Sequence, residues 1–224
     1  MKKLIILANL LFLLCGCKID FTGDLYTSDL IDLANSKEDK VFNLPMEIAY
    51  QVASCEELDS VNRIISTYFI DYNNTGCDLG EDFMSYAKAQ VTVPVVNSYD
   101  IFNNSGDSLI GFVTYLSEDN KYVYVDATIN STLYESLKDY VYNETLQELS
   151  LTESNLSIRL NNDLNSVTVQ VQPSFVNSKP IVFATEYVLD RRELMIIEAS
   201  NVNSAYLEQN LWTPLFLLIN SVQN

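Results

Sequence analysis

The sequence predicts an α+β fold, because two hydrophobic periodicities alternate along its 224 residues. Some segments carry an apolar residue at every second position, as half-buried strands do, and others repeat apolar residues every three or four positions, as helices do. From about residue 155 to residue 200 only the strand-like pattern occurs. We therefore expect an N-terminal β-α-β-β-β-α unit over residues 17–150. A mostly antiparallel β unit with a short C-terminal helical tail should follow over residues 151–224.

The N-terminal unit is predicted to open with a short strand and a brief helix. Residues 18–26 alternate apolar and polar side chains, and a hydroxyl at Thr27 or Ser28 can cap the helix that follows. Residues 41–53 alternate in the same way, which indicates a second half-buried strand. Pro45 lacks an N–H group within this strand and therefore favours an edge position.

A capped helix begins the middle of this unit. Ser54 with Glu57 three residues later forms a capping box, and apolar residues at helical spacing continue to about Ile70. Pro94 suggests that the next strand also lies at an edge. The segments predicted after the helix are a loop over 71–82, a strand over 90–96, a loop over 98–107, a hairpin of 109–116 with 122–129, and a helix over 131–149.

The second unit is predicted to contain two β-hairpins. The expected strand pairs are 156–160 with 167–171, and 181–189 with 194–198. A short helix over 203–210 should follow. A last helix would have Thr213 as its N-cap and Pro214 at its first position.

The first residues have the pattern of a secretory signal. Lys2 and Lys3 precede an apolar run that is too short to cross a bilayer as a helix. The segment Leu14-Cys15-Gly16-Cys17 resembles the lipobox of bacterial lipoproteins, in which the cysteine is lipidated and the signal is cleaved before it. The resemblance implies a signal peptide over residues 1–16 and a mature chain held in the membrane by acyl chains on Cys17.

The resemblance also implies a location in the cell envelope. In lipoproteins of Gram-negative bacteria, Asp directly after the lipidated cysteine usually retains the protein in the inner membrane. Lys18 stands at this position, so we expect the periplasmic face of the outer membrane. The body more distantly resembles uncharacterised enterobacterial lipoproteins and lipoproteins encoded by phages or plasmids, which also begin with a strand and a short capped helix.

Two cysteines remain after the signal, Cys55 and Cys77. An even pair in an oxidising compartment predicts a disulfide, which would contribute about 3 kcal/mol by constraining the unfolded chain. The alternative is two buried thiols. A helix that ran from Cys55 to Ile70 would carry the chain about 24 Å away. The return to Cys77 therefore requires an extended segment or a shorter helix.

Composition excludes several function classes. The chain has 30 acidic and 13 basic residues, a net charge of −17, which disfavours nucleic acid as a partner. Solubility explains this acidity, and a basic partner or a cation is the alternative. The absence of histidine rules out Ser-His-Asp and Cys-His catalysis, and no phosphate-binding or dinucleotide fingerprint occurs. We expect neither an enzyme nor a cofactor.

One polar segment has the spacing of a calcium-binding loop, with Gly76 at its sixth position. The oxygen-bearing residues at its first, third, fifth and twelfth positions are Asp71, Asn73, Thr75 and Asp82. Asp replaces the bidentate Glu that such loops carry at the twelfth position. An ordinary turn held by Cys77 is the interpretation that we adopt, so no metal site is predicted.

The predicted function is therefore that of a non-enzymatic envelope lipoprotein that binds another envelope component, expected to be a protein. One version is a mobile-element lipoprotein that masks a surface receptor and causes superinfection exclusion. Arg191 and Arg192, a rare basic pair, are candidate contacts, and a solvated hairpin tip is the alternative for them.

The alternative function is a carrier of lipid or another hydrophobic ligand. Such a carrier needs an apolar cavity lined by strand residues such as Phe42, Ile48, Val93 and Phe112. A closed core would favour the binding module, and an open apolar groove would favour the carrier.

Overall fold

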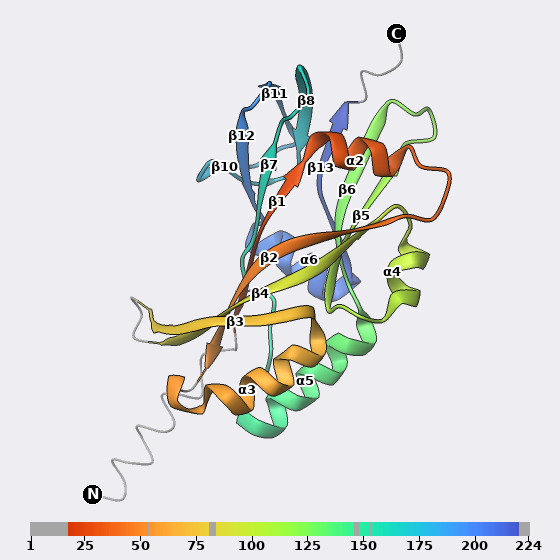
Figure 1. The fold of residues 1–224 in the computed structure, drawn as a ribbon. Helices are drawn as coiled ribbons and strands as arrows, with labels where there is room; N and C mark the ends of the chain where they lie inside the picture. Colours follow the sequence, from red (N-terminus) through yellow and green to blue (C-terminus); the bar gives the residue numbers. More distant parts are fainter. Residues whose placement is uncertain (1–17, 53, 81–83, 146–147, 153, 220–224) are drawn as a thin grey trace, which may run out of the picture.

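One large, nearly closed sheet dominates the computed structural model of this chain (Figure 1). The structure describes residues 18–52, 54–80, 84–145, 148–152 and 154–219. Within these ranges thirteen strands belong to the sheet, and they confirm a mixed α+β protein. None of the helices within these ranges has the length and apolar character that crossing a membrane requires.

Helices separate groups of strands along the described chain, and β7 to β12 follow one another without a helix. The strands are β1 (Ile19–Tyr26), β2 (Val41–Val52), β3 (Ile70–Leu79), β4 (Ser85–Val96), β5 (Ile110–Leu116), β6 (Tyr122–Ile129), β7 (Leu156–Asn161), β8 (Ser166–Val171), β9 (Ser174–Val176), β10 (Lys179–Ile181), β11 (Thr185–Asp190), β12 (Leu194–Glu198) and β13 (Trp212–Ile219). The helices are α2 (Thr27–Ala34), α3 (Leu58–Ile65), α4 (Tyr99–Ser105), α5 (Ser131–Thr145) and α6 (Asn201–Asn210). Short 3₁₀ turns at Cys55–Glu57 and Ser66–Tyr68 flank α3.

The order of strands in the sheet mixes the two predicted units. It runs β10-β9-β12-β7-β1-β2-β4-β5-β6-β13-β8-β11, and β3 pairs with β4 beside this path. The β1–β7 and β4–β5 pairs are parallel, and the other pairs are antiparallel. Because β7 extends the sheet from β1, and β13 lies between β6 and β8, described strands of both predicted units share one sheet and contribute to one core cluster.

The four strands predicted between residues 155 and 200 correspond to β7, β8, β11 and β12, but the predicted partners were wrong, and the short strands β9 and β10 were not predicted. Strand β7 pairs with β12, and β8 pairs with β11. The β7–β12 pairing ends with Asn161 opposite Leu194, and the β8–β11 pairing begins with Ser166 opposite Asp190. The pairing therefore resumes after the turns, and the turn between β7 and β8 is one residue longer than the turn between β11 and β12. The four strands therefore form one long two-stranded ribbon that bends in the middle. Each local turn that resembled a hairpin is a corner of this ribbon.

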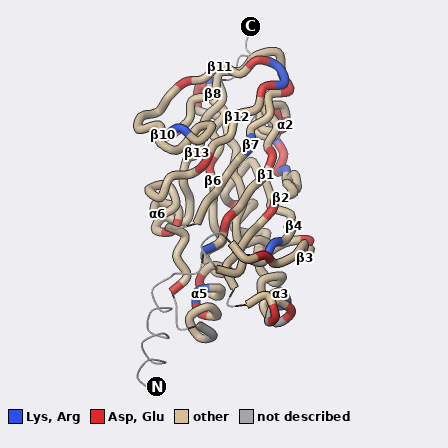
Figure 2. Tube along the Cα trace, turned by 90° about the vertical axis from the view of Figure 1, so that its left-hand side faces the viewer, with Lys and Arg blue, Asp and Glu red and all other residues tan. Residues whose placement is uncertain are grey.

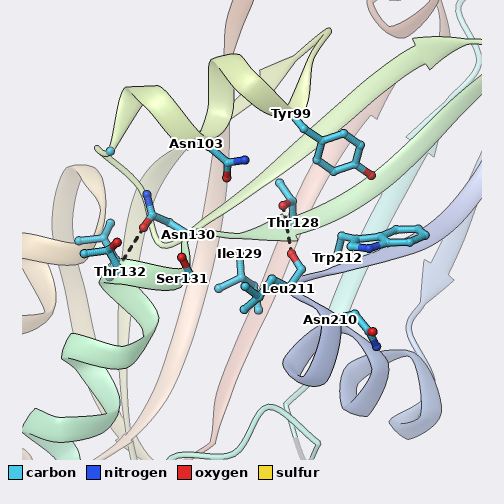
Figure 3. A pocket seen from close by; sticks show the side chains of 12 residues that line it. Tyr99, Asn103, Thr128, Ile129, Asn130, Ser131, Thr132, Asn210, Leu211 and Trp212 are labelled. Carbon is cyan, nitrogen blue, oxygen red and sulfur yellow. Dashed lines mark hydrogen bonds between the residues drawn. The ribbon is translucent and has the colours of Figure 1, made fainter.

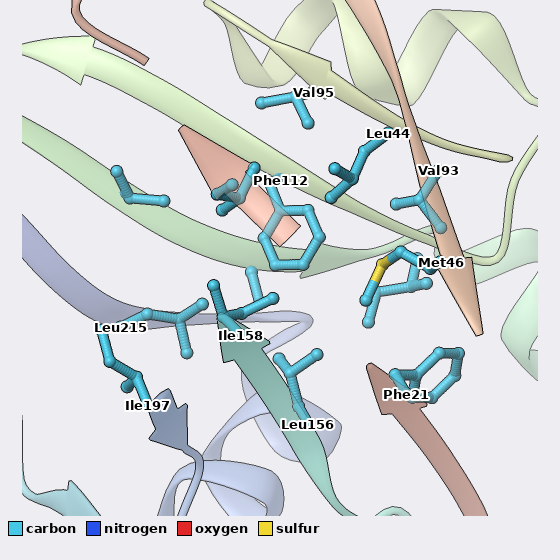
Figure 4. Close-up of a cluster of buried hydrophobic side chains, with 14 of the residues drawn as sticks. Phe21, Leu44, Met46, Val93, Val95, Phe112, Leu156, Ile158, Ile197 and Leu215 are labelled. Carbon is cyan, nitrogen blue, oxygen red and sulfur yellow. The ribbon is translucent and has the colours of Figure 1, made fainter. Parts of the chain in front are cut away.

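The interior of the sheet is filled by apolar side chains from strands far apart in the sequence (Figure 4). The inward residues alternate with polar neighbours as the sequence predicted. In β8, for example, Val167, Val169 and Val171 are buried, whereas Thr168 is half-buried. The core cluster drawn in Figure 4 includes Phe21, Leu44, Met46, Val93, Val95, Phe112, Leu156, Ile158, Ile197 and Leu215.

Pro45 and Pro94 lie where their strands have a hydrogen-bonded neighbour on one side alone. Pairing of β1 with β2 ends at Met46, so Pro45 lies where β2 has β4 as its partner alone. Pro94 lies on β4 between the segment that pairs with β3 and the segment that pairs with β5. The prediction of edge strands is nevertheless wrong, because β2 lies between β1 and β4, and β4 lies between β2 and β5.

A disulfide joins Cys55 to Cys77, with 5.7 Å between their Cα atoms. Both conditions for the return of the chain are met. The α-helix spans only Leu58–Ile65, and the segment predicted as a polar loop is the extended strand β3. Tyr72 and Asn74, on one face of this strand, both contact Asn62 on α3. The Tyr72 hydroxyl and the Asn74 amide donate hydrogen bonds to the Asn62 side-chain oxygen at 2.6 and 3.2 Å, which hold β3 over α3.

Two further predictions need correction. The expected loop after β4 contains α4, which Ser98 caps by accepting a hydrogen bond from the Asp100 N–H at 3.2 Å. The expected last helix is β13, because an unbroken apolar run suits a strand with neighbours on both sides as well as it suits a buried helix. Pro214 fits within β13 next to an irregularity in its pairing with β6.

The described chain begins at the end of the molecule that carries α3 and α5 (Figure 1). The Lys18 carbonyl accepts a hydrogen bond from the Gln51 N–H at 3.0 Å, next to the end of β2. Strand β1 then runs to the opposite end, where Ser28 at the start of α2 contacts Asp163 in the corner of the ribbon.

Candidate functional site

An open hollow of about 510 Å³ lies on the outer side of the sheet, between α4, the start of α5 and the junction of α6 with β13 (Figure 3). Its lining comes from three segments that are distant in the sequence. The lining residues are Tyr99, Asn103, Gly106, Thr128, Ile129, Asn130, Ser131, Thr132, Leu133, Asn210, Leu211 and Trp212.

Two helix ends shape the floor of this hollow. Asn130 follows β6, and its side-chain oxygen accepts a hydrogen bond from the Leu133 N–H at 3.1 Å, which caps α5. Leu211 has a φ of 66° and ends α6 in the left-handed conformation. Its carbonyl accepts hydrogen bonds from the Ile129 N–H at 2.8 Å and from the Thr128 hydroxyl at 3.1 Å. The end of β6, from which α5 starts, is thereby joined to the end of α6.

Aromatic side chains form one wall of the hollow. The ring of Trp212 lies edge to face with Tyr206 at 5.7 Å and with Tyr99 at 6.5 Å between ring centroids. A second group of rings continues from Tyr99 across the sheet, since Tyr99 contacts Tyr115, and Tyr115 stacks on Tyr124 at 5.3 Å. Trp212 nevertheless remains 37% exposed, so its ring is accessible from the hollow.

A buried carboxylate lies behind this wall. Asp126 on β6 is 1% exposed, and its Oδ2 accepts hydrogen bonds from the Tyr99 hydroxyl at 2.5 Å and the Tyr115 hydroxyl at 3.1 Å. Its Oδ1 has no hydrogen-bond partner in the described part of the protein. Burial raises the pKa of Asp126, and the two tyrosine hydrogen bonds act in the opposite direction. Burial and the bond to Asp126 together raise the pKa of Tyr99, so its hydroxyl stays protonated.

The hollow offers hydrogen bonds and aromatic surface but no charged side chain among its lining residues. Its lining holds no pair of a nucleophile with a general base. Across the ranges that the structure describes, no three His, Cys, Asp or Glu side chains gather as a metal site would require. Acidic residues are instead spread along the molecule (Figure 2). This arrangement suits binding of an uncharged polar molecule.

The residues that have the spacing of a calcium-binding loop do not converge in the part of the segment that the structure describes. Asp71, Asn73 and Thr75 point outward from strand β3, and Asp82 lies outside the described residues. A strand advances about 3.3 Å per residue, which separates Asp71 from Thr75 by roughly 13 Å. Asp71 instead accepts a hydrogen bond from the Thr92 hydroxyl at 3.0 Å. The segment is thus a strand and not the turn that we expected.

The other predicted site residues that the structure describes are not among those that line the hollow. Cys17 lies outside the described residues. Arg191 and Arg192 are exposed in the turn between β11 and β12, at the ribbon corner. The backbone N–H of Arg192, which has a φ of 71°, donates a hydrogen bond to the Asn162 carbonyl at 2.7 Å. The backbone of Arg192 thus stabilises the ribbon corner, while the side chains of Arg191 and Arg192 face solvent.

The residues proposed for a carrier cavity belong to the packed core. Ile48, Val93 and Phe112 are at most 2% exposed, and Phe42 is half-buried against the same cluster. An apolar cavity beside Phe21 measures about 20 Å³, whereas ligand pockets usually measure about 300 Å³ or more. The interior at these residues is filled by the protein's own side chains.

No sequence pattern indicated the hollow, because its residues come from the separate segments 99–106, 128–133 and 210–212. Trp212, the single tryptophan of the chain, lies next to a predicted helix end and was the residue that came nearest to indicating a binding site there. Comparison with known families matches residues 20–223 to a model described as "Domain of unknown function (DUF7424)". No curated protein matches this sequence.

Proposed function

The chain belongs to the DUF7424 family, and we propose that it is a lipid-anchored envelope protein that binds another envelope component without catalysing a reaction. One observation carries this proposal: the core is packed, and the roomy hollow lies open on the outer surface. A carrier would need the reverse arrangement, with an enclosed apolar space. The filled positions of Ile48, Val93 and Phe112 therefore favour a binding module.

The proposed anchor is Cys17, directly before the first described residue. Its acyl chains would hold the end of the molecule with α3 and α5 near the membrane, most simply on the periplasmic face of the outer membrane. The Cys55–Cys77 disulfide supports an oxidising compartment. The hollow and the ribbon corner with Arg191 would then stay accessible to other envelope components.

Lipid labelling tests the anchor. Cells that express the full chain with Cys17→Ser should incorporate no labelled palmitate into it, and the protein should leave the membrane fraction. Cys15→Ser is the matched control, because Cys15 lies within the proposed signal and should leave labelling unchanged. Mature, membrane-bound Cys17→Ser protein would refute the anchor.

Site-specific photocrosslinking in the native host tests the binding role. A crosslinking residue at position 103 reports on the hollow, and one at position 191 reports on the ribbon corner. Asp59, exposed on α3 near the proposed anchor, is the control position. We expect capture of one envelope component from position 103 or 191 and not from position 59. Equal capture from all three positions, or from none, would contradict a defined binding surface.

Superinfection exclusion is the more specific version of this proposal. If the bound component is a surface receptor, expression of the wild-type chain should lower the plating efficiency of phages that use it. The Cys17→Ser chain should restore plating, because it would no longer be held beside the receptor. Equal protection by both chains would show that the anchor has no part in exclusion.

A further inference from the structure

We infer that the hollow between α4, α5 and β13 binds an uncharged segment of an envelope glycan, with a sugar ring packed against Trp212. The inference deepens the proposed function, on which it rests for the location of the ligand, by naming the chemistry of the bound component. It depends on three observations: the lack of charge in the lining, the accessible aromatic wall, and the hydrogen-bonding groups that are free around it.

The lack of charge is unusual for this chain. About a fifth of its residues are charged, yet the twelve lining residues include no Asp, Glu, Lys or Arg. An anionic ligand would find no cationic side chain here, and a cationic ligand would find no carboxylate within the lining. Asp126 on β6 is buried behind Tyr99, and its Oδ2 already accepts hydrogen bonds from two tyrosine hydroxyls. A neutral ligand fits this surface best.

The aromatic wall selects a ligand with apolar faces. Ring faces carry partial negative charge and attract partially positive C–H groups, which line one side of most sugar rings. Tyr206 and Tyr99 hold the Trp212 ring edge to face without covering it. The Tyr99 hydroxyl is bound to Asp126, so Tyr99 is fixed and cannot turn its hydroxyl freely into the hollow. The platform is therefore preorganised for packing.

Hydrogen-bonding groups face the same space from the opposite side (Figure 3). The Asn103 amide and the hydroxyls of Ser131 and Thr132 have no hydrogen-bond partner within the described part of the chain. The Asn130 oxygen is used by the α5 cap, which leaves its NH₂ group for a ligand. Side-chain amides and hydroxyls both donate and accept, as the neighbouring hydroxyls of a sugar require.

The size of the hollow agrees with this class of ligand. Its volume of about 510 Å³ falls within the range of roughly 300–1,000 Å³ that is usual for small-ligand sites. It is open along one side, as binding within a longer polymer requires. A packed, closed apolar pocket would instead indicate a lipid or a free hydrophobic molecule.

Fluorescence of the single tryptophan, Trp212, reports directly from this site. The full chain in detergent is titrated with tetrasaccharides of N-acetylglucosamine, of glucose and of galacturonate. We expect a saturable change in emission with at least one of the two neutral sugars and none with the acidic sugar. Absence of a change with both neutral sugars, or a stronger response to galacturonate, would overturn the inference.

Calorimetric titrations of three variants assign the binding to the hollow. Asn103→Ala and Trp212→Phe should each weaken binding of the active neutral sugar roughly tenfold, as loss of one hydrogen bond or part of a ring contact predicts. Tyr142→Ala removes an exposed aromatic ring on α5 outside the hollow and should leave binding unchanged. Unchanged binding by the first two variants, or equal loss in all three, would place the sugar elsewhere and overturn the inference.

These titrations are independent of the proposed anchor. If Cys17 is not labelled with palmitate but the chain binds the neutral sugar, the glycan site stands and the lipoprotein assignment is wrong. A chain that is lipidated but binds neither neutral sugar would keep its anchor and lose the glycan site.

Discussion

The side chain of Glu208 ties α6 to Tyr134 on α5 and to residues 150–152. Its carboxylate accepts hydrogen bonds from the Tyr134 hydroxyl at 2.8 Å and from the Leu151 N–H at 3.0 Å. The hydroxyls of Ser150 and Thr152 also donate to it, at 3.2 and 3.3 Å. Tyr134 is only 2% exposed, so removing the acceptor would leave a buried hydroxyl without a partner.

We predict that Glu208→Ala lowers the free energy of unfolding by about 2–3 kcal/mol, because hydrogen bonds to a charged acceptor are the stronger kind. Glu186→Ala, an exposed carboxylate on β11, is the control and should change it by less than about 0.5 kcal/mol. Urea denaturation of both variants measures the difference. Equal midpoints for the two would show that the Glu208 contacts contribute nothing beyond an ordinary surface charge.

Asp126 should make the stability of the protein depend on pH in an unusual direction. Because burial raises its pKa in the folded state, the folded protein binds a proton more readily than the unfolded chain does. This contribution to stability is full below the unfolded pKa of about 3.9 and is lost as the pH rises through the folded pKa. Most carboxylates that are paired in the folded state have a lowered pKa instead, so their contribution to stability is lost as the pH falls.

Asp126→Asn tests this dependence, since the amide keeps an oxygen that can accept from the hydroxyls of Tyr99 and Tyr115. Relative to the wild type, the variant should gain stability as the pH rises from about 4, and the gain should level off above the folded pKa. Urea midpoints measured across this range give the comparison. Parallel stability curves for the two proteins would contradict a raised pKa at position 126.

At the scale of secondary structure, the sequence predicted elements well where the decisive contacts are local. The hairpin of β5 and β6 and helix α5 follow from alternation, a polar turn and helical spacing within one segment. Strand β3 was missed because its polar composition hides a pairing with β4 that comes later in the chain. Strand β13 was predicted as a helix because its neighbours, β6 and β8, cannot be identified from its own residues.

The alternation of β8 leads to a prediction about its two faces. Val169 is fully buried against β13, whereas Thr168, the next residue, is half-buried on the other face. Val169→Asp should lower the free energy of unfolding by several kcal/mol, because it buries an unpaired charge. Thr168→Asp should have little effect. Urea midpoints distinguish these outcomes, and equal losses at both positions would rule out the strand register.

At the scale of the whole molecule, topology explains what the sequence could not predict. The pattern of β7, β8, β11 and β12 indicated four strands correctly, yet their partners depend on a corner where Asn162 bonds to Glu193 and Arg192. The hollow was missed for the same reason, because Tyr99, Asn130 and Trp212 meet only when β5, β6 and β13 are placed side by side. Contacts between distant segments carry no local sequence pattern.

The shared sheet predicts that the chain unfolds as one cooperative unit. Strand β1 has β7 as a neighbour and β6 has β13, so neither predicted unit can keep its sheet intact without strands from the other. Trp212 fluorescence reports on β13 in the second half, and far-ultraviolet circular dichroism reports on the strands and helices of the whole chain. Urea transitions of the full chain followed by the two probes should therefore coincide. A fluorescence transition that preceded the loss of circular dichroism would show that residues 151–224 unfold separately, and that the ribbon contributes less to the core than its pairing with β1 and β13 implies.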